Sequence, residues 1–78
     1  MDKKQIGERL RIARVRKGMR QIDVAVALED YGIELNQTAI GKIERGDRRL
    51  YVHELAAFTE VLEVSADWVV KGGELNVR

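Results

Sequence analysis

Apolar side chains recur at three- and four-residue spacing over most of the chain, and this spacing places them on one face of an α-helix. The first such stripe consists of Ile6, Leu10 and Ala13. It predicts a helix over residues 2–17 that ends at Gly18, because glycine readily takes the left-handed conformation found after a helix.

A second helix is predicted to begin at Arg20 or Gln21 and to stop at Gly32. Its inward positions are Val24, Ala25 and Leu28, whereas Ile22 and Val26 lie nearer its outer side. Arg20 is a poor N-cap because a guanidinium has no acceptor for a free backbone N–H, so this helix should start less sharply than most. After Gly32, two apolar residues can cover the core between helices: Ile33 and Leu35.

The segment from Asn36 to Gly46 has the clearest two-sided pattern. Asn36 is a strong N-cap candidate, and Gly46 is a natural residue to end the helix. One side carries a narrow apolar stripe of Ala39, Ile40 and Ile43. The other side holds an amide, a hydroxyl, two cations and a glycine, but no acid: Gln37, Thr38, Gly41, Lys42 and Arg45. Such groups read base edges and phosphates in a DNA groove, although polar faces are also common on ordinary surface helices.

Two further helices are predicted after a short polar loop. The fourth covers residues 51–62, with five apolar side chains expected to face inward: Val52, Leu55, Ala56, Phe58 and Leu62. Ser65 would cap a fifth helix over residues 66–70 that carries Trp68 and Val69 against the core. We expect one domain over residues 1–72 and a short C-terminal tail over residues 73–78.

Charge is distributed unevenly, although the net charge of the 78 residues is only +1. Residues 1–20 carry eight basic and two acidic side chains, and residues 36–49 carry four basic and two acidic ones. Residues 21–35 carry four acids and no base, and residues 50–78 are also acidic overall. A one-sided basic surface is typical of phosphate binding, while a basic solvated helix face is the simpler alternative.

Other chemistries find little support in the composition. The chain has no Cys and a single His, His53, so neither a thiolate site nor a pair of His ligands is available for a metal. It contains no Ser/His/Asp arrangement and no phosphate-cradling glycine loop. We therefore expect a protein that is not an enzyme, with no metal, no cofactor and no evident small-molecule ligand. No apolar run approaches a membrane span and the N-terminus is charged, so we expect a cytoplasmic protein with no membrane partner.

Four groups of residues follow one another in a specific order: Ile6-Gly7-Glu8-Arg9-Leu10-Arg11 with Arg14; Gly18-Met19 and Gln21 with Val24, Ala25 and Leu28; Ala39-Ile40-Gly41-Lys42-Ile43-Glu44-Arg45-Gly46; and Val64-Ser65-Ala66-Asp67-Trp68. In order and spacing they resemble the Cro and lambda-repressor-like (XRE) helix-turn-helix family, over about residues 6–72. The resemblance implies an all-α, five-helix DNA-binding domain whose second and third helices form the helix-turn-helix.

The same resemblance implies roles for individual residues. The base-reading side chains would be Gln37, Thr38 and Lys42. The contacts to the DNA backbone would come from Gln21, Asn36, Arg45, Arg48 and Arg49. Family members often pair the residues at the positions of Arg14 and Glu44, which would explain an acid in an otherwise basic helix. Arg20 stands where the family usually has a capping residue, so it offers an extra phosphate contact. The segment between Leu28 and Asn36 is longer than the tight turn of the family.

These features predict a sequence-specific transcriptional regulator, a dimeric repressor that reads a palindromic operator in double-stranded DNA. A homodimer is expected because one such module makes few base contacts. A helix of about five residues cannot bury apolar side chains that point in opposite directions. Val61, Trp68 and Val70 are therefore predicted to form the dimer contact, against the simpler reading of scattered exposed apolar residues. The alternative function is an antitoxin-type interaction module that mainly binds a toxin or another protein.

Overall fold

The computed structural model describes residues 2–73, and the secondary-structure elements of these residues are helices joined by loops. Its α-helices are α1 (Lys3–Arg16), α2 (Gln21–Leu28), α3 (Gln37–Arg45), α4 (Val52–Leu62) and α5 (Ala66–Lys71). A 3₁₀ turn, Glu29–Tyr31, extends α2 as far as Gly32. The predicted all-α, five-helix fold is therefore confirmed. Apart from Gly73, the predicted tail lies outside the described residues.

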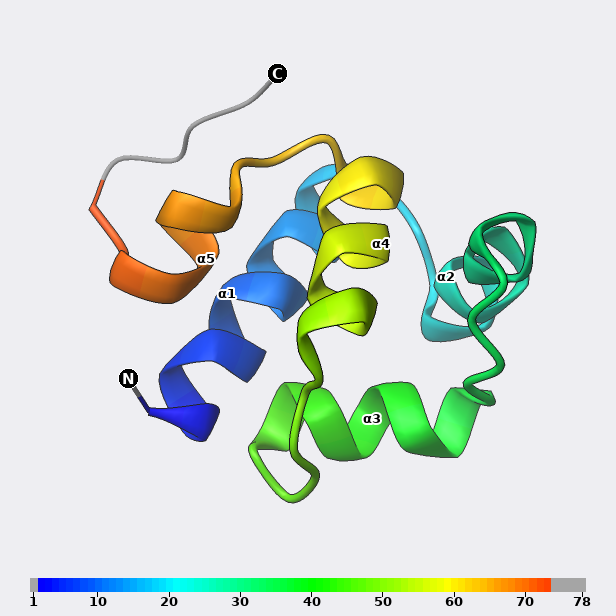
Figure 1. Ribbon diagram of the computed structural model, residues 1–78, viewed down its shortest axis with the longest axis horizontal. Coiled ribbons are helices and arrows are strands. Elements are labelled where there is room, and N and C mark those ends of the chain that lie inside the picture. Colours follow the sequence, from blue (N-terminus) through cyan, green and yellow to red (C-terminus); the bar gives the residue numbers. More distant parts are fainter. Residues whose placement is uncertain (1, 74–78) are drawn as a thin grey trace.

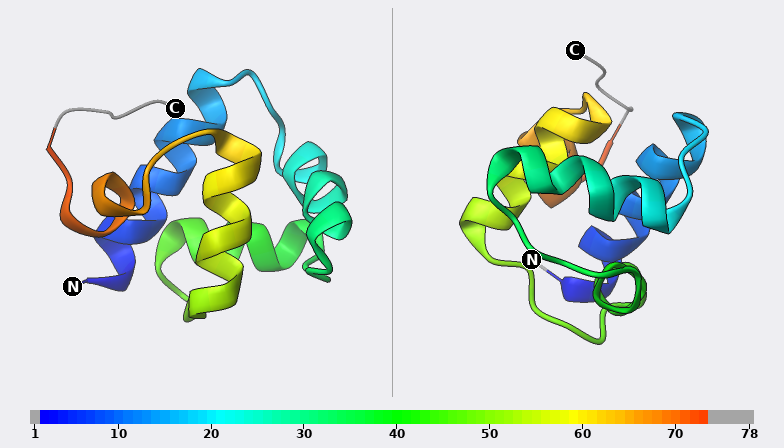
Figure 2. Two further views of the ribbon diagram at one scale, coloured as in Figure 1. Left: turned by 45° about the horizontal axis from the view of Figure 1, so that its top comes forward. Right: turned by 90° about the vertical axis from the view of Figure 1, so that its right-hand side faces the viewer.

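The helices surround one apolar core, with α3 lying across the base of α1 and α4 (Figure 1). In the right-hand view of Figure 2, α3 is seen nearly end-on and α2 crosses above it. The side chains that the periodicity placed inside and that are almost completely excluded from solvent include Leu10, Leu28, Ile40 and Ile43. Ile33 and Leu35 are also buried, so the segment before α3 covers the core as expected.

Local sequence signals fix where the helices begin and end. The side chains of Asp2, Asn36 and Ser65 accept hydrogen bonds from the first turns of α1, α3 and α5. Gly46 ends α3 in the left-handed conformation, with φ of 78°. At the start of α2 the Arg20 side chain makes no capping bond, and instead the Asp23 carboxylate accepts the Arg20 backbone N–H at 2.8 Å.

The helices α1 and α3 approach each other closely, and Gly7 makes this possible. A Cβ atom at Gly7 would overlap the carbonyl oxygen of Ile43 and would lie 2.7 Å from that of Glu44. Since both are backbone atoms, neither could move aside without moving α3 itself. The absence of a side chain at Gly7 therefore sets how α3 sits against the rest of the domain.

The structure corrects the expected inner face of α4. Val52 is 84% exposed and Ala56 is also exposed, so both predictions were wrong. Glu54, Ala57 and Val61 are buried instead. The face that turns inward includes a carboxylate because Arg48, from the preceding loop, hydrogen-bonds to Glu54 through both of its terminal nitrogens, at 2.9 and 3.1 Å.

Candidate nucleic-acid interface

The outer face of α3 presents polar side chains from a rigid support. Gln37, Thr38, Lys42 and Arg45 are all exposed, as is the capping residue Asn36. The opposite face of the helix packs on α1 and α2. Because Ile40 and Ile43 are buried on that packed side, the polar face is held at a fixed angle to the domain. The amide, hydroxyl and ammonium groups on it can donate to or accept from base edges and phosphates.

Gly41 was placed on the polar side of this helix, and the structure corrects that position. It is buried in the contact between α2 and α3. A Cβ atom at Gly41 would lie 3.1 Å from Nη1 of Arg45 and 3.6 Å from Nε2 of Gln21. Gly41 therefore provides the space in which these two side chains come close to the helix backbone.

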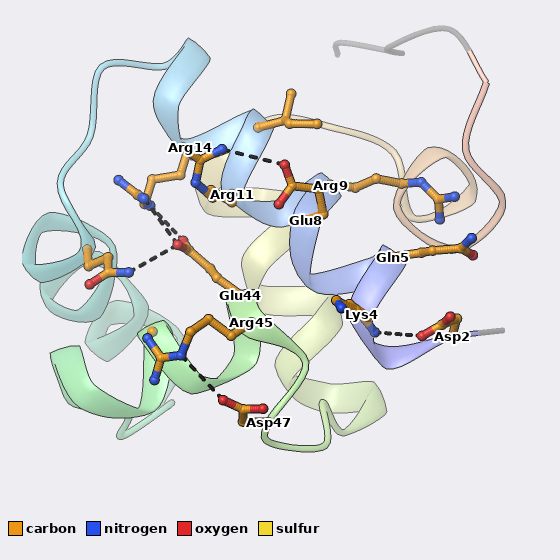
Figure 3. A pocket seen from close by; sticks show the side chains of 13 residues that line it. Asp2, Lys4, Gln5, Glu8, Arg9, Arg11, Arg14, Glu44, Arg45 and Asp47 are labelled. Carbon is orange, nitrogen blue, oxygen red and sulfur yellow. Dashed lines mark hydrogen bonds and ion pairs between the residues drawn. The ribbon is translucent and has the colours of Figure 1, made fainter.

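A buried carboxylate joins the first three helices. Glu44 accepts hydrogen bonds from Nε of Arg14 at 2.6 Å, from Nη2 of Arg14 at 3.1 Å and from Nε2 of Gln21 at 3.1 Å. The Glu44 side chain is only 5% exposed, and Arg14 also donates to the carbonyl oxygen of Met19 at 2.9 Å. Figure 3 shows Arg14 reaching down from α1 to Glu44 on α3. The structure thus brings the expected Arg14–Glu44 pair together and adds Gln21 to it.

The arginines that were expected to contact the DNA backbone differ in whether they already pair with an acidic side chain. Arg20 is paired with Asp23 at 2.9 Å in an exposed position, and these hydrogen bonds lower the pKa of the Asp23 carboxyl. Arg48 is held by the buried Glu54, whereas Arg49 is exposed. Burial alone would raise the pKa of Glu54, but hydrogen bonds from the Arg48 side chain and the Tyr51 N–H outweigh it, so the pKa lies below its ordinary value.

One acidic residue next to the polar face of α3 was not anticipated. Asp47 follows the end of α3, and its carboxylate accepts a hydrogen bond from Nε of Arg45 at 3.3 Å. It lines an open hollow of about 360 Å³ together with Thr38 and Lys42. It also lines a larger hollow of about 1190 Å³ between α1 and α3 (Figure 3). The sequence carries a signal for this position, since the residue after a helix-ending glycine lies beside the last turn of the helix.

The residues predicted to form a dimer contact are mostly used inside the domain. Val61 is 8% exposed and Trp68 is 6% exposed, and both belong to the apolar core. Val61 was expected to face outward and is buried instead, whereas Trp68 lies against the core as the pattern of the fifth helix predicted, so neither side chain is exposed for a contact with a second copy. The short helix α5 packs against both α1 and α4, which covers more of its surface than a single neighbour would. Only Val70 of the three is partly exposed.

Two other findings concern residues 2–73 as a whole. No helix among them is both long enough and apolar enough to cross a bilayer. Within the same residues, no cluster of three or more His, Cys, Asp or Glu side chains is arranged to hold a metal ion.

Comparison with known proteins agrees with this geometry. The restriction-modification controller protein C.AhdI from Aeromonas hydrophila has a similar solved structure, with a TM-score of 0.75 and 24% sequence identity over 86% of this chain and 94% of that one. The P22 c2 repressor, solved in complex with the synthetic operator 9T, also has a TM-score of 0.75, with 26% identity over 87% of this chain and 96% of that one. No curated protein sequence matches the chain. Residues 5–69 match the family described as the helix-turn-helix domain. The chain therefore belongs to the helix-turn-helix domain family and has the fold of the lambda-repressor-like DNA-binding regulators.

Proposed function

We propose that the protein is a sequence-specific transcriptional regulator that inserts α3 into the major groove of double-stranded DNA. The observation that carries this proposal is the exposed face of α3, where Gln37, Thr38 and Lys42 stand on a helix fixed from behind by the core. An amide suits the N6 and N7 edge of adenine, and an ammonium suits the O6 and N7 edge of guanine.

The flanks of α3 support contacts to the sugar-phosphate backbone. Gln21 lies at the start of α2 beside Gly41, and Arg45 lies on the same side of α3. Asn36 and Arg49 are exposed near the two ends of α3. Donors on both flanks of a reading helix fix its register on the duplex, because phosphate contacts position a protein without specifying sequence.

The protein would regulate transcription by occupying a two-fold symmetric operator as two copies. One module offers about three base-reading side chains, which is too few for high selectivity among genomic sites. Two copies on half-sites one helical turn apart would double the contacts. Val70, the partly exposed member of the expected dimer residues, is our candidate for part of the seam, and sedimentation of wild type and Val70→Asp would detect it.

In vitro selection from a random duplex library tests the base-reading role. We expect wild type to enrich a defined motif, and Lys42→Ala or Gln37→Ala to weaken binding to that motif by about 1–3 kcal/mol each while relaxing preference at particular base pairs. His53→Ala is a suitable control, because His53 is exposed on α4 and not on α3. Equal losses on selected and random duplexes would contradict base reading by these two residues.

A further inference from the structure

A carboxylate stands at the edge of the polar face of α3, whose two exposed charged side chains, Lys42 and Arg45, are cations. Asp47 is held at the end of α3 because its backbone N–H donates to the carbonyl oxygen of Lys42 at 2.8 Å. Its side chain is 63% exposed. It borders the hollow that contains Thr38 and Lys42 as well as the hollow that contains Arg45 and Gln21. Any duplex that meets both sides of α3 therefore passes close to this negative charge.

The same carboxylate holds a guanidinium in place. Arg45 turns toward Asp47 in Figure 3, and the bond joins Nε of Arg45 to Oδ2 of Asp47. The other end of the guanidinium, Nη1, occupies the space above Gly41, where a Cβ atom would lie 3.1 Å away. The bond at Nε and the space over Gly41 at Nη1 together favour one orientation of this exposed group. Its terminal N–H groups stay available to donate as a fork to a phosphate or a base edge.

The negative charge of Asp47 and its hydrogen bond to Arg45 affect binding to cognate and to non-cognate DNA differently. Repulsion between Asp47 and phosphates weakens every complex, whatever its sequence, because the backbone charge is the same everywhere. Orientation of Arg45 helps only where a partner group stands in one fixed place, which is the situation in a specific complex. Asp47 should therefore lower affinity for random DNA more than affinity for the correct site.

We infer that Asp47 is a specificity-determining residue, which orients Arg45 for the correct site and repels the backbone of all other DNA. This inference rests on the proposed DNA-binding function and adds a residue that raises selectivity by opposing non-specific binding.

Titrations of Asp47→Asn against a selected duplex and a random duplex test the inference. Removing the charge should steepen the log–log salt dependence on random DNA by up to about one unit, since one more phosphate charge is then neutralised without opposition. With a slope change of about 0.9, the affinity of Asp47→Asn for random DNA, relative to that of wild type, should be about 3.5-fold larger at 50 mM salt than at 200 mM salt. Affinity for the selected duplex should rise less or fall, so the ratio of selected-duplex affinity to random-duplex affinity should drop at each salt concentration.

Asp67→Asn is the matched control, because it removes the same charge from α5, on a different side of the domain from α3 (Figure 1). It should leave the affinity ratio unchanged. Equal changes on both duplexes in Asp47→Asn, or weaker binding to random DNA, would overturn the inference.

A double-mutant cycle of Asp47→Asn and Arg45→Ala separates the orienting effect of Asp47 on Arg45 from the effect of its negative charge on phosphates. If Asp47 acts through Arg45, the two changes are coupled on the selected duplex and additive on random DNA. Additivity on both duplexes would remove the orienting role. The proposed function is checked in the same titrations, because a wild type that prefers no sequence contradicts DNA reading itself. A selective wild type with an unchanged ratio in Asp47→Asn contradicts only the inference about Asp47.

Discussion

Replacement of Glu44 by alanine should destabilise the domain far more than loss of an exposed acid. Glu44 accepts three hydrogen bonds from Arg14 and Gln21 while only 5% of its side chain is exposed. In Glu44→Ala the Arg14 guanidinium, itself 14% exposed, would lose its carboxylate and would keep only its bond to the Met19 carbonyl oxygen. Breaking a buried ion pair by removing one partner costs about 3–5 kcal/mol, because the remaining charge stays desolvated.

We expect a value near the lower end, about 3 kcal/mol, because Arg14 keeps one protein acceptor and partial access to water. In a domain of this size, 1 kcal/mol corresponds to about 4–8 °C, so the melting temperature should fall by about 12–24 °C. Such a loss would remove much of the total stability, which is about 0.05–0.15 kcal/mol per residue in native proteins.

Urea denaturation of wild type, Arg14→Ala, Glu44→Ala and the double variant measures the coupling energy between Arg14 and Glu44. The double variant should be less destabilised than the sum of the two single variants, because it strands neither charge. Glu8→Ala is the matched control, since Glu8 pairs with Arg11 at 3.5 Å with both side chains more than half exposed, and it should lose less than about 1 kcal/mol. If Glu44→Ala does not fold, Glu44→Gln, whose side chain has nearly the same shape, takes its place in the double-mutant cycle. A loss as small as that of Glu8→Ala, or a coupling energy near zero, would refute the reasoning.

Three further predictions concern packing, phosphate contact and pH. Gly7→Ala should lower the free energy of unfolding by about 1–3 kcal/mol in urea, because a Cβ there meets the α3 backbone; unchanged stability would contradict the close crossing of α1 and α3. Arg49→Ala should weaken binding to all duplexes alike and make the salt slope shallower by about one unit in titrations; an unchanged slope would place Arg49 away from the DNA. The stability that Glu54 contributes should be complete above the ordinary Glu pKa of about 4.3 and lost as the pH falls through its lowered folded pKa. The difference in unfolding free energy between wild type and Glu54→Gln should therefore shrink below about pH 4, and a constant difference would contradict the lowered pKa.

Most of the fold follows from local signals in the sequence. Asn36 and Gly46 mark α3 from both ends, because each residue type solves a backbone problem that arises only at a helix terminus. The apolar stripe of α1 also identifies its buried face correctly. These signals depend on residues within one or two turns, so they can be read without knowledge of neighbouring elements.

The errors arose where the answer depends on distant residues. Val52 was expected inside and Glu54 was not considered, yet the inward position of Glu54 depends on Arg48 and on the path of the loop between α3 and α4. Val61 was assigned to a dimer contact, and Trp68 both to the core and to that contact, yet both are buried inside the domain, where α5 packs on α1 and α4. The apolar periodicity of one helix does not show how many other helices will pack against it.

The site shows the same division. The polar residues of α3 are visible in the sequence as the face left over by its apolar stripe. The seating of Arg45 between Gly41 and Asp47, and the addition of Gln21 to the Arg14–Glu44 pair, require the three-dimensional arrangement of α2 and α3. The sequence could therefore indicate which face of α3 is polar and exposed, but not how its side chains are held.

The central claim is that the exposed face of α3 reads DNA sequence. Selection from a random duplex library with wild type and with a triple variant, Gln37→Ala, Thr38→Ala and Lys42→Ala, tests it most directly. All three side chains are exposed, so the variant should keep the fold, which circular dichroism can verify. We predict that wild type enriches one motif and that the folded variant binds DNA without enriching it. Enrichment of the same motif by both proteins, or of no motif by wild type, would contradict the claim.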